Sequence, residues 1–196
     1  MVALFVRDLT EGIADTGVRA AVLKCAIEKS LTPGVERVMR AVAKAHLRTG
    51  APIVVHTSAA HRTGLVAQDV FRGEGVDPAA LVLDRSGDTD DLDYVRALID
   101  GGSPVGMDRL GLDLYLPGEQ RIANLVKLVG EGLAGRLTLS HDASCHIDWF
   151  PPGVREQITP NWNFTTSPTR SCRRCATPAS PRSRSRRCSS TTRAGF

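Results

Sequence analysis

The feature that most constrains the fold is a repeated unit, in which a short apolar run ends in a polar residue and precedes a helical stretch. Strands that alternate with helices at this spacing predict βαβ units around a parallel sheet. The runs are nearly continuous in apolar residues, as expected for strands covered on both faces. The pattern therefore predicts an α/β fold. The five runs cover 18–24, 52–56, 80–85, 103–108 and 136–142.

Helical periodicity follows four of these runs. The helix expected at 33–49 has the clearest boundaries, because Thr32-Pro33 is a helix-start signal and Gly50 a helix-stop signal. No glycine-rich phosphate loop follows the first run, which argues against a dinucleotide-binding fold. The other three helices are expected at 64–75, 90–99 and 119–131.

Each run ends in a polar side chain: Lys24, His56, Arg85, Asp108 or Asp142. In a (β/α)₈ barrel the functional residues lie at the carboxyl ends of the strands. Lysine, histidine and aspartate there can bind a metal or act as acids and bases. A polar residue also starts any βα loop, so each one alone is better explained as a loop-start residue than as a ligand. Taken together, Lys24, His56 and Asp142 favour a site.

The charge distribution separates the chain into a body and a tail. The net charge is +4, but the segment 165–196 contains eight arginines and no lysine, aspartate or glutamate. The remaining residues carry 17 basic and 21 acidic groups, so the body is mildly acidic. No run approaches the roughly 18 apolar residues of a membrane span, and the first eleven residues do not resemble a signal peptide. We therefore expect a cytoplasmic protein with reduced cysteines and no membrane partner.

Six segments of the body resemble the phosphotriesterase-like hydrolases of the amidohydrolase superfamily. The resemblance covers about Leu4 to Phe164, and LGLDLYLP is closest to the lactonase branch. It implies a (β/α)₈ barrel, of which this chain would contain about the last five strands. The domain expected from it covers 1–164. The six segments are AAVLKCA, TGAPIVVHTSAAHRTG, SGDTDDLDYV, VGMDRLGLDLYLP, LTLSHDASCHIDW and TPNWNF.

The resemblance also implies an active site with two divalent metal ions, for which zinc, cobalt or manganese suits the ligand set. Lys24 matches a lysine that CO₂ carboxylates and that bridges both metals. His56 matches a ligand of the more exposed metal. Asp142 matches a ligand of the buried metal that also accepts a proton. The implied reaction is hydrolysis of lactones and organophosphate triesters by a metal-bridging hydroxide.

Three further residues match positions that contact substrate in this family: Arg109, Cys145 and Trp149. The implied partner is thus a small-molecule lactone or organophosphate ester, and the family resemblance makes a homodimer an expectation too.

Two departures from the family bear on activity. The paired histidines of its first strand, an HxH, are absent from this sequence. Arg85 stands where the family has a metal-binding histidine, and a guanidinium offers no lone pair to a metal. Three of the six family ligands therefore remain, namely Lys24, His56 and Asp142. The alternative to an active hydrolase is a noncatalytic remnant of one.

The segment 165–196 lacks apolar periodicity and is rich in arginine, serine, proline and threonine, so it is predicted to be disordered. Its composition also suggests a shifted reading frame. Resequencing that found a family-like helix in the same frame would contradict this hypothesis. A further alternative function is nonspecific binding of anions through these arginines. Since aromatic residues do not alternate with them, we do not expect a nucleic-acid partner.

Overall fold

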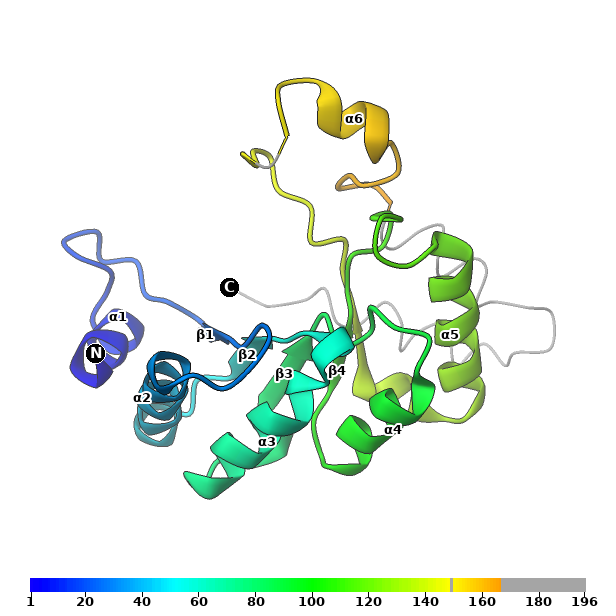
Figure 1. Cartoon of the computed structure of the whole chain (residues 1–196). Helices are drawn as coiled ribbons and strands as arrows, with labels where there is room; N and C mark the ends of the chain where they lie inside the picture. Colours follow the sequence, from blue (N-terminus) through cyan, green and yellow to red (C-terminus); the bar gives the residue numbers. More distant parts are fainter. Residues whose placement is uncertain (149, 167–196) are drawn as a thin grey trace. The chain divides into compact units, whose positions relative to one another are not determined.

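A computed structural model describes residues 1–148 and 150–166 (Figure 1). The chain forms two compact units. Unit 1 comprises Met1–Ser86 and Asp93–Val105, and unit 2 comprises Gly87–Leu92 together with the chain from Gly106 onward. Trp149 and 167–196, which includes most of the predicted disordered tail, lie outside the described residues.

Unit 1 is built on parallel strands that pair in chain order. The strands are β1 (Leu23–Ala26), β2 (Ile53–His56) and β3 (Leu81–Asp84). Ala26 lies opposite His56, and His56 lies opposite Asp84. The first residue of β4 (Val105–Met107) pairs with Leu83 at the edge of this unit. The parallel α/β arrangement expected from the repeated unit is thus confirmed.

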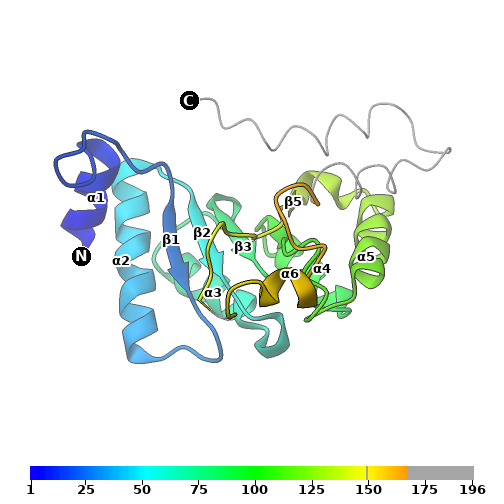
Figure 2. The ribbon, with the colours of Figure 1, turned by 90° about the horizontal axis from the view of Figure 1, so that it is seen from above.

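Side chains alternate between a buried and a more accessible face of these strands, as the two-residue period of a strand requires. On the buried face Ile53, Val55, Leu81 and Leu83 have no exposed surface. Burial of each such side chain stabilises the fold by roughly 1.5–3 kcal/mol. The helices of this unit are α2 (Pro33–Thr49), α3 (Thr63–Gly73) and α4 (Leu92–Asp100). Figure 2 shows α2 running alongside β1.

The bounds of α2 agree with the prediction because its end signals form the expected contacts. The Thr32 hydroxyl accepts a hydrogen bond from the Val35 backbone N–H at 3.3 Å. Gly50 ends the helix with φ +72°, a left-handed conformation that glycine adopts without steric cost. The other three predicted helices lie within two residues of their expected bounds.

The start of the chain differs from the prediction. The first element is a helix of nine residues, α1 (Val2–Thr10), which contacts α2. This helix was not predicted from the sequence. The apolar run at 18–24 becomes strand only from Leu23 onward. Val18 and Val22 stay exposed, so the run continues past Lys24 to Ala26 rather than ending at the lysine.

Unit 2 contains the rest of β4, followed by α5 (Gly118–Gly130), β5 (Leu137–Leu139) and α6 (Val154–Ile158). In the strand order β5 is the neighbour of β4. The buried residues of α5 include Leu125, Leu128 and the charged Arg121. Short 3₁₀ turns at Ala59–His61, Pro78–Ala80 and Leu133–Arg136 complete the described elements. Among the described helices, none is both long and apolar enough to cross a membrane.

Candidate active site

Lys24 and His56 project from the accessible face of adjacent strands in unit 1. Leu23 and Cys25 are buried on the opposite face, so strand alternation places Lys24 on the accessible one. His56 is the last residue of β2, and its side chain has the same orientation as Val54 by the same alternation. The structure therefore brings these two predicted residues onto one face, near the carboxyl ends of their strands.

Each of these side chains has a carboxylate partner. The Lys24 Nζ lies 3.1 Å from Asp84 Oδ2. The His56 Nε2 lies 2.7 Å from Glu28 Oε1, just beyond β1. Both carboxylates face the same side of the sheet as Lys24, because Glu28 follows it by four residues and Asp84 is in register with His56. The accessible face thus carries one lysine–aspartate ion pair and one histidine–glutamate contact.

Arg85 lies beyond β3, in a turn, and not within the strand. Its φ is +64°, a left-handed conformation that is uncommon for residues other than glycine. Asp84 is therefore the last strand residue, and it is Asp84 whose side chain joins the face that carries Lys24 and His56.

A buried hydrogen-bond network lies behind the ends of β2 and β3. The Thr57 hydroxyl donates to the Asp84 carbonyl at 2.8 Å and lies 2.7 Å from the Ser86 hydroxyl. The Tyr94 hydroxyl lies 3.3 Å from Ser86 and accepts from the Gly64 backbone N–H. Burial raises the pKa of Tyr94, which keeps its hydroxyl protonated as a donor. This network holds the positions that follow His56 and Asp84.

In unit 2 the structure brings together Asp142 and Arg109. The Arg109 Nε lies 3.5 Å from Asp142 Oδ2, and its Nη1 donates to Asp88 Oδ2 at 2.7 Å. The guanidinium also lies 4.5 Å from the centre of the Tyr115 ring. These contacts leave Arg109 largely buried, between two carboxylates and one aromatic ring.

Asp88 joins a second buried arginine to this group. Arg121 of α5 is fully buried, and its Nη1 donates to Asp88 Oδ1 and to the Asp108 carbonyl. Its Nε and Nη2 are buried without a hydrogen-bond partner among the described protein atoms. Asp88 therefore contacts both guanidinium groups, and Arg109 has Asp142 as a second carboxylate partner.

The backbone at Asp142 is held by its neighbours. Asp142 has φ +51° and lies after β5. The Ala143 N–H donates to His141 Nδ1 at 2.8 Å, and the Trp162 indole N–H donates to the His141 carbonyl at 2.7 Å. These bonds stabilise the left-handed turn that presents the Asp142 carboxylate, which is about one-third exposed.

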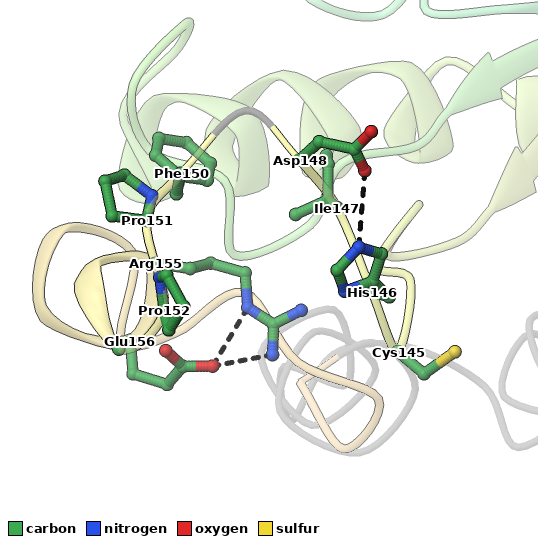
Figure 3. A pocket seen from close by; sticks show the side chains of 10 residues that line it. Cys145, His146, Ile147, Asp148, Phe150, Pro151, Pro152, Arg155 and Glu156 are labelled. Carbon is green, nitrogen blue, oxygen red and sulfur yellow. Dashed lines mark hydrogen bonds and ion pairs between the residues drawn. The ribbon is translucent and has the colours of Figure 1, made fainter.

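The loop after Asp142 forms a cavity of about 230 Å³ together with α6 (Figure 3). Its lining includes Cys145 and Phe150. Figure 3 shows His146 facing Asp148, at 3.4 Å, and Arg155 facing Glu156, at 2.7 Å. Cys145 is exposed, whereas Trp149 lies outside the described residues.

The residues present do not fit the two-metal centre that the family resemblance implies. Within the described part of the chain, no three histidine, cysteine, aspartate or glutamate side chains group so as to hold a metal. Lys24 and His56 each contact a carboxylate instead. The five histidines of the sequence also contain no HxH, and Arg85 cannot replace a histidine ligand.

Asp84 and Glu28 are the residues at this face that sequence reasoning missed. The signal for Asp84 was the alternation along LVLD, which places it on the same face as Val82. The predicted run extends to Arg85, one residue past the end of the strand at Asp84. Glu28 lies after a strand whose end was set two residues too early.

Comparison with known proteins gives consistent results. The model of the phosphotriesterase family matches residues 1–167. A phosphotriesterase homology protein of Mycobacterium tuberculosis is 48% identical over 165 residues, which cover 84% of this chain and 51% of that protein. An aryldialkylphosphatase of Saccharolobus solfataricus is 39% identical, covering 83% of this chain and 52% of that protein. The chain spans about half the length of the curated relatives it matches.

Solved structures agree with the sequence relatives. The structure of the phosphotriesterase from M. tuberculosis matches with a TM-score of 0.83 and 47% identity, over 85% of this chain and 52% of that one. An organophosphorus hydrolase from Deinococcus radiodurans matches with a TM-score of 0.77 and 30% identity, over 84% of this chain and 51% of that one. These matches confirm the expected fold class, with the described residues forming five strands of the barrel-type sheet. The chain belongs to the phosphotriesterase family.

Proposed function

We propose that the protein hydrolyses small-molecule esters of the lactone and organophosphate triester classes, with Arg109 and Asp142 of unit 2 as active-site residues. Family membership supports an ester hydrolase. The observation that carries the proposal is the pairing of Arg109 with Asp142 in unit 2. A carboxylate that is partly exposed and contacts a largely buried guanidinium is suited to accept a proton from a substrate or from water.

Asp142 is proposed as the residue that accepts a proton during hydrolysis. Its carboxylate is accessible to water, and the left-handed turn at Asp142 limits the directions in which the side chain points. Arg109 is proposed to orient Asp142 through the 3.5 Å contact. Because Asp88 and Tyr115 occupy the rest of its guanidinium, its effect on the substrate would come mainly through Asp142.

The loop cavity is the proposed place for the ester substituents. Ile147, Phe150 and Pro151 supply apolar surface there, and Cys145 lies at its margin. Ligand pockets combine mostly apolar walls with a few polar groups, which matches this lining. Trp149 is proposed as a further part of this wall by family resemblance alone.

A noncatalytic role is the second candidate. It is favoured by the carboxylate partners of Lys24 and His56, and by Arg85 at a family ligand position. Under this proposal the chain keeps the family fold and a ligand-sized cavity without turnover.

Hydrolysis assays with a γ-lactone and an aryl dialkyl phosphate, in buffer containing Zn²⁺ or Co²⁺, separate the two candidates. The hydrolase proposal predicts turnover above buffer that falls about a hundredfold in Asp142→Asn, as expected for loss of an acid–base group. Asp69→Asn, an exposed substitution on α3, is the matched control and keeps the wild-type rate. Turnover that survives in Asp142→Asn contradicts the proposed role of Asp142. A wild-type rate equal to buffer supports the noncatalytic candidate.

A further inference from the structure

The ion pair between Lys24 and Asp84 crosses a strand. Lys24 belongs to β1 and Asp84 to β3, so the lysine side chain extends over β2 to reach the carboxylate. Lys24 is in register with Val54, and Asp84 with His56, so the lysine side chain extends toward the carboxyl end of the sheet to reach Asp84. The amine nitrogen thus lies over the middle strand, with an anion of this chain already in contact.

Carboxylation of a lysine would reverse the charge at this position. In that reaction the amine nitrogen forms a bond to the carbon of CO₂ and loses a proton, which gives an anionic carbamate. A carbamate on Lys24 would then stand next to the Asp84 carboxylate, and like charges in contact disfavour each other. The anion that the family resemblance assigns to CO₂ would be supplied here by Asp84 of β3, two strands away from Lys24.

His56 also has a carboxylate partner on this face. Glu28 lies within 2.7 Å of the His56 Nε2, the ring atom that would otherwise be available to a metal. Lys24 and His56 therefore both have anionic partners from the chain itself.

We propose that Lys24 remains an unmodified lysine with Asp84 as its counter-ion, in place of the carbamate that the family resemblance implies. The proposal concerns the chemical state of one side chain. It holds whether or not the protein hydrolyses esters, so its failure and the failure of the proposed function are separate results.

The wild-type chain can be tested directly by ¹³C NMR in ¹³C-bicarbonate, with and without Zn²⁺. The expected result is no protein-bound carbamate resonance in either sample. A resonance that is present in the wild type and lost in Lys24→Arg would overturn the proposal.

Amine labelling gives a positive readout on the same protein. Reductive methylation followed by peptide mass analysis measures the extent of methylation of Lys24. We express it as a ratio to the methylation of Lys44 and Lys127, which are exposed on helices. Because a carbamate would protect the amine, the proposal predicts that bicarbonate with Zn²⁺ leaves the Lys24 ratio unchanged. Strong protection of Lys24 alone would contradict it.

A variant pair tests the role of Asp84. Asp84→Asn removes the charge and keeps the shape, so the labelling of Lys24 should rise about twofold, the size expected for loss of a partly exposed ion pair. Asp69→Asn removes a carboxylate that pairs with Arg72, and it should leave the Lys24 ratio unchanged. An unchanged ratio in a folded Asp84→Asn protein would show that Asp84 is not the counter-ion.

Discussion

Neighbouring residues of β1 have opposite environments. Lys24 faces the accessible side of the sheet, while Cys25 is buried against the helices. Burial raises the pKa of the Cys25 thiol to about 12, and the positive charge of Lys24 offsets only part of this rise. A thiol with such a pKa is inert at neutral pH. The exposed Cys145 is the described cysteine that reagents can reach.

The Cys25 thiol should make the stability of the protein depend on alkaline pH. Its pKa is higher in the folded chain than the ordinary value of 9.0, so its contribution is complete below pH 9 and is lost as the pH rises toward 12. In this window the free energy of unfolding should fall by about 1 kcal/mol per pH unit from this group. Urea unfolding of wild type and Cys25→Ala at several pH values measures it.

The variant should show a smaller loss of stability above pH 9 than the wild type. Some loss remains in Cys25→Ala, because burial also raises the pKa of Tyr94. Cys145→Ala is the control and should keep the wild-type dependence, since Cys145 is exposed. The same alkaline slope in wild type and Cys25→Ala would argue against the proposed environment of the thiol.

At the scale of elements, Asp88 connects α5 with the segment after β4. It contacts Arg121 from the helix and Arg109 from the loop that follows the strand. All three side chains are at most one-tenth exposed. Removal of a carboxylate from such a group leaves buried positive charge uncompensated, which costs more than the ion pair itself contributes.

Substitutions at Asp88 and at Arg121 should therefore lower the free energy of unfolding by different amounts. Asp88→Ala should lower the free energy of unfolding by about 3–5 kcal/mol, because the buried Arg121 loses its carboxylate partner and Arg109 keeps only Asp142. Arg121→Met should cost less, since it removes a charge with two unpartnered nitrogens and leaves Asp88 paired with Arg109. Chemical denaturation of both variants measures which substitution causes the larger loss of stability. A larger loss in Arg121→Met would refute this account of the group.

Local signals in the sequence predicted most of the elements. The bounds of α2 followed from Thr32 and Gly50, whose contacts are made within a few residues. The strand ends were less predictable, because an apolar run does not show where pairing begins. The exposed Val18 and Val22 belong to the run but pair with no strand among the described residues.

The candidate site was predictable only in part, because the sequence does not show which strands pair or in which register. Lys24 and His56 could be assigned to one face from their strand runs and from the family motifs. Their carboxylate partners could not, since Glu28 and Asp84 depend on the register between strands. The pairing of Arg109 with Asp142 joins residues far apart in the sequence, and it too requires the fold.

At the scale of the whole molecule, a family fold is combined with an altered site. The comparisons place the chain in the phosphotriesterase family over nearly all its described residues. On the accessible face of unit 1, the two residues that the family resemblance predicts as metal ligands, Lys24 and His56, nevertheless each contact a carboxylate. The family fold and the family metal centre are therefore separate properties, and the fold alone does not establish the centre.

Metal content tests this central claim most directly. The chain is saturated with Zn²⁺, dialysed, and measured for zinc per chain by elemental mass spectrometry, with the double variant Lys24→Ala, His56→Ala as a control. Our account predicts that the wild type retains fewer than two zinc ions per chain and no more than the double variant. Two tightly retained zinc ions in the wild type, lost in the double variant, would contradict it.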